Sequence, residues 1–145
     1  MNHAEDDEVH VLLVEDDSAL AQMYRVKLER DGYTVHVAGD GEEALSVLTY
    51  ELPDLIFLDV RLPRMDGFAF LERIRATQWT RNIPVVILSN YSGAELVSRG
   101  LRLGALEYLI KGRTTPGQLS EGVRNWSRPY TFDEPLAPIP MRDVL

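Results

Sequence analysis

The chain has 145 residues, of which 45% are apolar and 26% are charged, and its formal net charge is −8. This length and balance fit one soluble globular domain, and the lack of cysteine excludes disulfides and cysteine nucleophiles. A protein this acidic has no basic patch for direct binding of nucleic acid. Its apolar runs are too short for a membrane span, and its N-terminus lacks a secretory signal. We therefore expect a cytoplasmic protein.

Five short apolar runs follow an acidic leader that occupies residues 1–8. The runs are Val9–Val14, Thr34–Ala38, Leu55–Leu58, Val85–Leu88 and Tyr108–Ile110. The first, third and fourth each contain four consecutive apolar residues. Such runs are typical of strands that are buried on both faces of a parallel sheet.

Segments of helical length separate these runs and carry apolar residues at spacings of three and four. The predicted helices are Ser18–Asp31, Gly41–Tyr50, Gly67–Thr77, Ala94–Leu103 and a last helix that begins at Thr115 and ends near Trp126. Thr115 is the predicted N-cap, and Pro116 stands at the first helical position. Gln118 would complete a capping box with Thr115. The sequence therefore predicts a doubly wound α/β domain over residues 9–127, a (βα)₅ sandwich of three layers.

The composition changes after residue 127, because four of the eight prolines stand at positions 129, 135, 138 and 140. Proline cannot extend a helix or a central strand, so residues 128–145 are predicted to form an extended tail without an output domain. The short apolar segment Pro135–Pro140 is a candidate for packing back on the domain or on a partner.

Polar residues follow four of the five runs, at the strand ends where ligands bind in doubly wound sheets. The first run ends in Glu15-Asp16-Asp17, the third in Asp59, the fourth in Ser89 and the fifth in Lys111. Taken singly, an aspartate such as Asp17 before a helix is more often an N-cap, and a lysine that ends a strand usually marks only where the chain meets water. Ser89 could equally cap the loop. Together, these residues predict one pocket of carboxylates, a hydroxyl and an ammonium.

Crowded carboxylates repel one another unless a cation lies between them. An all-oxygen set with few protein ligands suits Mg²⁺, which commonly also binds a phosphate. Lys111 adds a second positive charge and Ser89 a hydrogen-bond donor. The pocket is therefore suited to neutralising a phosphoryl group on a carboxylate nucleophile.

The segments that carry these residues resemble the receiver domain of two-component response regulators, of the chemotaxis-regulator type. They are Val11–Asp17, Pro53–Gly67, Ile83–Ser89 and Leu103–Lys111, and the resemblance extends from about Val9 to Trp126. It implies a flavodoxin-like sheet of strand order 2-1-3-4-5. The chain is expected to be either a stand-alone receiver or a part of a longer protein.

The resemblance implies that Asp59 accepts a phosphoryl group from a histidine kinase or a histidine phosphotransfer protein. Mg²⁺ would be bound directly by Asp17, Asp59 and the backbone carbonyl of Arg61, whereas Asp16 would act through water. Lys111 would pair with the phosphoryl oxygens.

The resemblance also implies a switch, in which Ser89 moves to the phosphoryl group and Tyr108 turns inward behind it. This would change the surface of the fourth helix, fifth strand and fifth helix, where a downstream protein or a second copy of the chain would bind. Candidate residues for a dimer face are Leu96, Val97, Leu101, Glu121, Val123 and Arg124. Packing of the helices on the sheet explains most of them equally well.

Two features depart from the family pattern. Gly112 stands where proline usually follows the lysine, and glycine fixes no backbone conformation in the loop before the last helix. Asn90, Tyr91 and Arg61 surround the expected phosphorylation site. They either crowd the phosphoryl group and prolong its lifetime or simply point into solvent.

Two other functions compete with a phosphorylated switch. A receiver-like interaction module that works without phosphorylation is disfavoured, because the acceptor, metal and lysine positions are all filled. A Mg²⁺-dependent phosphohydrolase would need an aspartate two residues after the nucleophile, where Arg61 cannot shuttle protons. We therefore expect an acceptor with slow autophosphatase activity and not a turnover enzyme.

Overall fold

The computed structural model describes residues 8–133, and its strands and helices lie within a few residues of the predicted positions. The strands are β1 (His10–Val14), β2 (Thr34–Ala38), β3 (Leu55–Leu58), β4 (Val85–Ser89) and β5 (Glu107–Ile110). The helices are α2 (Ser18–Arg30), α3 (Gly41–Leu48), α4 (Gly67–Ala76), α5 (Ala94–Arg102) and α6 (Pro116–Trp126), with a 3₁₀ turn at Lys111–Arg113. The predicted α/β class is confirmed.

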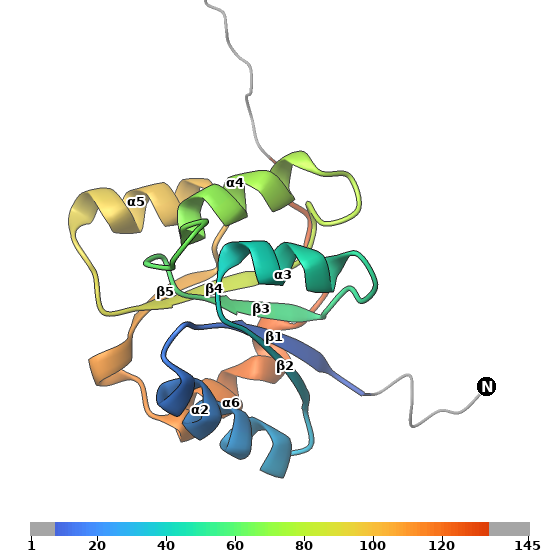
Figure 1. Cartoon of the computed structure of the whole chain (residues 1–145), viewed down its shortest axis with the longest axis vertical. Coiled ribbons are helices and arrows are strands. Elements are labelled where there is room, and N and C mark those ends of the chain that lie inside the picture. Colours follow the sequence, from blue (N-terminus) through green and yellow to red (C-terminus); the bar gives the residue numbers. More distant parts are fainter. Residues whose placement is uncertain (1–7, 134–145) are drawn as a thin grey trace, which may run out of the picture.

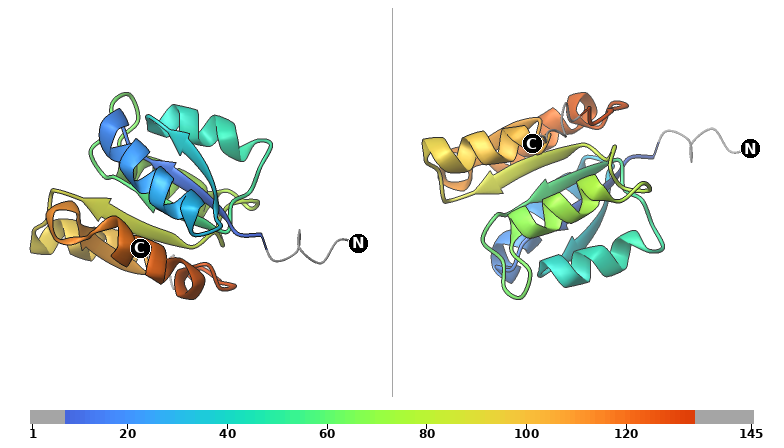
Figure 2. Two further views of the ribbon diagram at one scale, coloured as in Figure 1. Left: turned by 90° about the horizontal axis from the view of Figure 1, so that it is seen from below. Right: turned by 90° about the horizontal axis from the view of Figure 1, so that it is seen from above.

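The five strands form one parallel sheet in the order β2-β1-β3-β4-β5, as the resemblance implied. Helices α3, α4 and α5 cover one face of the sheet, and α2 and α6 cover the other (Figure 1). Figure 2 shows α2 with α6 from below and the three other helices from above. The direction of winding changes between β1 and β3, so the carboxyl ends of these two strands border the crevice where ligands bind in such folds.

The sheet separates two apolar clusters. Leu12 and Val14 of β1 belong to the cluster under α3, α4 and α5, whereas Val11 and Leu13 belong to the cluster under α2 and α6. All four are about 1% exposed. Burial on both faces explains why the strand sequences are apolar at consecutive positions and do not alternate with polar residues.

The start of α6 confirms the predicted capping box. The hydroxyl of Thr115 accepts a hydrogen bond from the backbone N–H of Gln118 at 3.1 Å, and the side chain of Gln118 accepts one from the backbone N–H of Thr115 at 2.9 Å. These bonds fix where the chain turns from the end of β5 into the last helix.

The segment after α6 packs against the domain, so contacts with the packed unit continue past residue 128, where the tail was predicted to begin. The hydroxyl of Tyr130 donates to the carbonyl of Gly104 at 3.0 Å, and Phe132 is 6% exposed. The guanidinium of Arg75 lies 5.2 Å from the Tyr130 ring centre and 5.1 Å from that of Phe132. The leader up to residue 7 and the tail from residue 134, with its Pro135–Pro140 segment, lie outside the described residues.

Between residues 8 and 133, none of the helices has both the length and the apolar character that crossing a bilayer requires.

Candidate functional site

Three charged side chains meet where β1, β3 and β5 end. The ammonium Nζ of Lys111 lies 2.7 Å from Oδ2 of Asp59 and 2.6 Å from Oε1 of Glu15. Their side chains are 9%, 6% and 2% exposed for Lys111, Asp59 and Glu15 respectively. One ammonium thus serves two buried carboxylates, which compensates part of the cost of removing these carboxylates from water.

Asp59 is held by backbone contacts on several sides. Its N–H donates to the carbonyl of Val14 at 3.1 Å, and its Oδ1 accepts from the N–H of Arg61 at 3.1 Å. Helix α4 begins at Gly67 in direct contact with the backbone of Asp59 and Val60, and any Cβ at position 67 would overlap those atoms. Only glycine allows this close approach, which fixes the helix beside the carboxylate.

The carboxylates of Glu15, Asp16 and Asp59 form a cluster in which one oxygen from each lies within 4.8 Å of the others. Asp16 is exposed, so the cluster is open to solvent on its side. Burial raises the pKa of Glu15, although its hydrogen bond with Lys111 acts in the opposite direction. Carboxylate oxygens with one side in water are a donor set that fits Mg²⁺ and not a soft metal.

Lys111 keeps its charge in this setting. Burial alone would lower the pKa of Lys111, but hydrogen bonds to Asp59 and Glu15 and the charges of both outweigh it, so the pKa is raised. The site therefore presents a permanent ammonium beside Asp59 at neutral pH.

The structure shows Asp17, predicted to be a direct metal ligand, in a second role. Asp17 is the N-cap of α2, and its Oδ1 accepts from the N–H of Leu20 at 3.1 Å. Its carboxylate is therefore used to cap the helix and is not part of the cluster, in which Glu15 stands instead. Glu15, which directly follows the last residue of β1, was predicted to lie in the pocket but was not assigned to the metal.

The two predicted switch residues both contact the backbone of Tyr91. Ser89 is fully buried at the end of β4, and its Oγ accepts from the N–H of Tyr91 at 3.1 Å. The hydroxyl of Tyr108 donates to the carbonyl of the same residue. Burial raises the pKa of Tyr108, so this hydroxyl keeps its proton at neutral pH. Tyr91 therefore connects Ser89 to Tyr108.

Arg61 and Tyr91 also contact each other through their side chains. The guanidinium carbon of Arg61 lies 4.2 Å from the ring centre of Tyr91, which is a cation–π distance. Tyr91 is 46% exposed, and Asn90 is exposed as well. The stacked pair joins the loop after β3 to the loop after β4 at the rim of the site.

Comparison with known proteins identifies this arrangement. A family model described as the response regulator receiver domain matches residues 11–124, which include every residue of the site. The chain belongs to the receiver domain family. This membership confirms the resemblance that the sequence motifs indicated.

Among curated relatives, the receiver is 36% identical over 124 residues to the transcriptional regulatory protein AfsQ1 of Streptomyces coelicolor, covering 83% of this chain and 54% of that protein. It is 38% identical over 101 residues to the response regulator PleD of Caulobacter vibrioides, covering 70% of this chain and 22% of that protein. The chain thus spans about half or less of the length of these relatives.

Solved structures show the same fold. A putative response regulator from Chloroflexus aurantiacus superposes with a TM-score of 0.77 at 33% identity, covering 83% of this chain and 98% of that one. The chemotaxis protein CheY4 of Vibrio cholerae superposes with a TM-score of 0.76 at 30% identity, covering 82% and 98%.

The departure of this receiver at Gly112 lies within the 3₁₀ turn Lys111–Arg113. A Cβ built at position 112 would meet no atom within 4 Å, so packing does not require glycine there. Of the candidate dimer-face residues, Val123 is fully buried against the sheet, whereas Leu101 is 48% exposed. Val123 therefore belongs to the core of the receiver, and Leu101 remains a candidate for a contact surface.

Proposed function

We propose that this receiver accepts a phosphoryl group on Asp59 from a histidine kinase or a histidine phosphotransfer protein, in a Mg²⁺-dependent reaction in the cytoplasm. The observation that carries the proposal is the placement of Asp59, whose two carboxylate oxygens contact Lys111 and the N–H of Arg61 beside Glu15 and Asp16. The phosphorylated cyanobacterial phytochrome response regulator RcpA, 26% identical with a TM-score of 0.75, supports it by similarity.

Glu15, Asp16, Asp59 and the backbone carbonyl of Arg61 are the groups that would hold Mg²⁺. Glu15 takes the place first given to Asp17, for the reason that Asp17 caps α2. Bound Mg²⁺ would supply positive charge beside the phosphoryl oxygens and offset the repulsion among the carboxylates.

The chemistry asked of the protein is mostly positioning and charge stabilisation. An oxygen of Asp59 forms a bond to phosphorus as the P–N bond to the donor histidine breaks. The ammonium of Lys111 already lies beside Asp59 and donates to the incoming phosphoryl oxygens. With arginine at position 61, no second aspartate is present there to speed hydrolysis, so the domain acts as an acceptor with slow autophosphatase activity.

Phosphorylation is proposed to reach the surface through Tyr91. When the hydroxyl of Ser89 donates to the phosphoryl group, its contact with the N–H of Tyr91 changes, and the carbonyl of Tyr91 holds the hydroxyl of Tyr108. A shift of this loop thus alters the position of Tyr108 and the surface formed by α5, β5 and α6. We propose that a downstream protein, or a second copy of this chain, reads that surface.

Intact mass spectrometry after incubation with Mg²⁺ and acetyl phosphate tests the proposal. We expect a single phosphoryl adduct on the wild type, its loss with a chelator, and no adduct on Asp59→Asn. Asp133→Asn, which changes an exposed aspartate away from the site, is the matched control and is expected to be phosphorylated normally.

Absence of an adduct from the wild type leads to a titration with beryllofluoride, which tests whether the site is too crowded for the donor. If neither acetyl phosphate nor beryllofluoride binds, the phosphorylation-independent interaction module replaces this proposal.

A further inference from the structure

A groove with exposed apolar side chains lies at the end of the domain opposite Asp59. Among residues 8–133, the three most exposed large apolar side chains are Trp79 at 76%, Tyr50 at 67% and Leu52 at 51%. Trp79 belongs to the connection between α4 and β4, and Tyr50 and Leu52 belong to the connection between α3 and β3. Both connections precede parallel strands, whereas Asp59 follows one, so the groove lies at the other end of the sheet.

Two hollows of the surface share Leu52 and Trp79 and so form one groove. One hollow extends from these two residues to Tyr50, and the other extends to Asn82 and Pro129. We call the joined hollows the Trp79 groove. Exposed aromatic side chains that gather in a groove are typical of surfaces that bind another segment of chain, because covering them removes apolar area from water.

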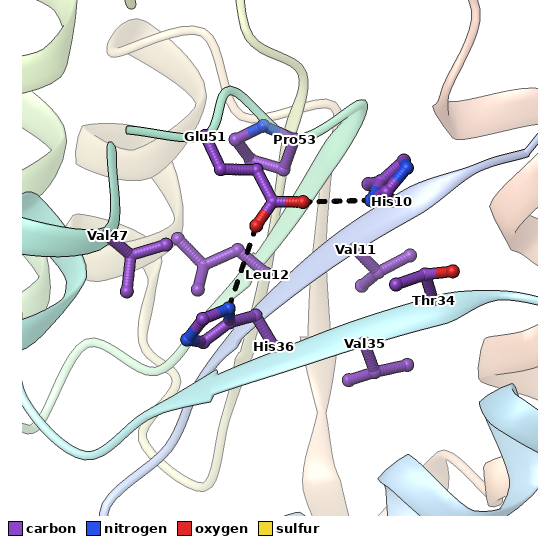
Figure 3. A pocket seen from close by; sticks show the side chains of 9 residues that line it. All are labelled: His10, Val11, Leu12, Thr34, Val35, His36, Val47, Glu51 and Pro53. Carbon is purple, nitrogen blue, oxygen red and sulfur yellow. Dashed lines mark ion pairs between the residues drawn. The ribbon is translucent and has the colours of Figure 1, made fainter. Parts of the chain in front are cut away.

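The loop that carries Tyr50 and Leu52 contacts the sheet through the residue between them, Glu51. Figure 3 shows the carboxylate of Glu51 between the side chains of His10 on β1 and His36 on β2. Its oxygens lie 2.9 Å from Nδ1 of His10 and 3.7 Å from Nδ1 of His36. Contacts with two strands position this wall of the Trp79 groove, so little of it has to be ordered on binding.

The chain itself passes along this groove after α6. Pro129 lines the groove, and the backbone N–H of Phe132 donates to Oδ1 of Asn82 at 2.9 Å. Phe132 is 6% exposed, so it anchors the chain beside Asn82. The apolar segment Pro135–Pro140, which lies outside the described residues, begins three positions later. Three residues span at most about 11 Å, so this segment starts close to the groove.

We propose that the Trp79 groove binds the chain's own segment Pro135–Pro140. The sequence of this segment, Pro-Leu-Ala-Pro-Ile-Pro, contains the Pro-x-x-Pro spacing of peptides that bind grooves lined with aromatic side chains. Proline has little backbone freedom to lose on binding, because its ring already fixes φ. Leu136 and Ile139 add apolar side chains that contact with Trp79 would remove from water.

Tethering favours this segment over a separate partner. A peptide joined to its binding site by a short linker is present at an effective concentration of about millimolar. A weak contact is then enough to occupy the groove, and a proline-rich segment of another protein enters only by displacing residues 135–140. None of the groove residues belongs to the carboxylate site, so this proposal stands or fails independently of the proposed function.

NMR spectroscopy of the full isotope-labelled chain tests the proposal. We expect nuclear Overhauser effects between the indole ring of Trp79, identified by comparison with Trp79→Phe, and the methyl groups of Leu136 and Ile139. The double variant Leu136→Ser/Ile139→Ser should lose these effects and shift the indole N–H signal of Trp79. Val144→Ser, which removes an apolar side chain outside the segment, is the matched control and should leave the signal in place.

Absence of these effects in the wild type, with a Trp79 signal that the double variant leaves unmoved, would overturn the proposal. A mixture of labelled and unlabelled chains identifies the occupant. Effects within one labelled chain that persist on dilution support the proposal. Effects only between a labelled and an unlabelled chain would show that a second copy fills the groove. A Trp79 signal that moves only when a peptide of residues 134–141 is added would show an unfilled groove, and either of these two results contradicts the intrachain contact.

Discussion

The ammonium of Lys111 lies 2.6 Å from a carboxylate oxygen of Glu15, which joins the end of β5 to the end of β1 across the intervening strands. The same ammonium contacts Asp59 at 2.7 Å. Two buried negative charges therefore share one positive charge when no metal is bound. This arrangement links the stability of the receiver to the occupancy of its metal site.

Replacing Lys111 should show how strongly the two buried carboxylates destabilise the domain when they have no cation. In EDTA, we expect Lys111→Met to lower the free energy of unfolding by about 3 kcal/mol, because both buried charges lose their partner. Mg²⁺ should restore part of the loss. Urea unfolding with and without Mg²⁺ measures both effects. Lys27→Met, which removes an exposed pair with Asp31, should cost no more than about 0.5 kcal/mol. Equal stability of the two variants would contradict this account.

Variants of the neighbouring residues Asp16 and Asp17 test which of the two binds Mg²⁺ and which caps α2. Asp17→Ala should lower the free energy of unfolding by about 1 kcal/mol through loss of the α2 cap, and leave Mg²⁺ affinity nearly unchanged. Asp16→Ala should weaken Mg²⁺ binding by about tenfold or more, with little effect on stability. Calorimetric Mg²⁺ titration and urea unfolding separate these outcomes. The opposite pattern would return Asp17 to the metal site.

The stacking of Arg61 on Tyr91 is expected to shield the phosphoryl group from water. An exposed cation–π contact stabilises by about 0.5–1 kcal/mol, so Tyr91→Ala should speed autodephosphorylation by roughly two- to fivefold. Asn90→Ala tests the neighbouring position, and Tyr50→Ala serves as a distant control. The decay of the phosphorylated mass gives the rates. Unchanged rates in both site variants would show that these side chains do not set the lifetime.

Near the end of α4, Arg75 bonds to backbone carbonyls and, among residues 8–133, to no carboxylate. Its guanidinium donates to the carbonyls of Leu103 and Ile83, both at 2.8 Å, and burial lowers its pKa to about 10, so it stays charged at neutral pH. Arg75→Met should lower the free energy of unfolding by about 3 kcal/mol, because buried carbonyls lose their donors. A double-mutant cycle with Phe132→Ala should give a coupling of about 1 kcal/mol. Additive losses would show that Phe132 packs independently of Arg75.

Asp40 should make stability depend on pH in the acid range. Its hydrogen bond from the N–H of Glu43 and its ion pair with Arg64 lower the pKa of its carboxyl below the ordinary 3.8. This contribution is therefore present above pH 3.8 and is lost as the pH falls through the folded-state pKa. Thermal unfolding of wild type and Asp40→Asn between about pH 2.5 and 7 should converge at the acid end. Curves that stay parallel would contradict the assignment.

Much of the fold was predictable because local signals agreed with tertiary structure. The strands β1, β3 and β4 are apolar at consecutive positions, and Thr115 and Gln118 mark the start of α6 through bonds within one turn. Asp59 was predictable for a similar reason, since a carboxylate directly after a fully buried strand lies at its carboxyl end.

The details that the sequence left open depend on distances between side chains that no local pattern encodes. Three consecutive acidic residues follow β1. Metal ligands and helix N-caps are both commonly acidic, so the sequence did not distinguish the roles of Glu15 and Asp17. The contacts of Tyr130 and Phe132 with the domain could not be predicted from the sequence either. Proline content indicates an extended chain after α6, but not whether that chain packs on Gly104 and Arg75.

The contact of Gly67 with the backbone of Asp59 limits movement of Asp59 in one direction, toward α4. No side chain separates the start of α4 from the aspartate, so a displacement of Asp59 toward that helix meets backbone atoms at once. On the other side, Ser89 is joined to the β4–α5 loop through a hydrogen bond from the N–H of Tyr91. A change at Asp59 is therefore expected to pass to the β4–α5 loop through Ser89 and not to α4, whose backbone packs directly against the aspartate.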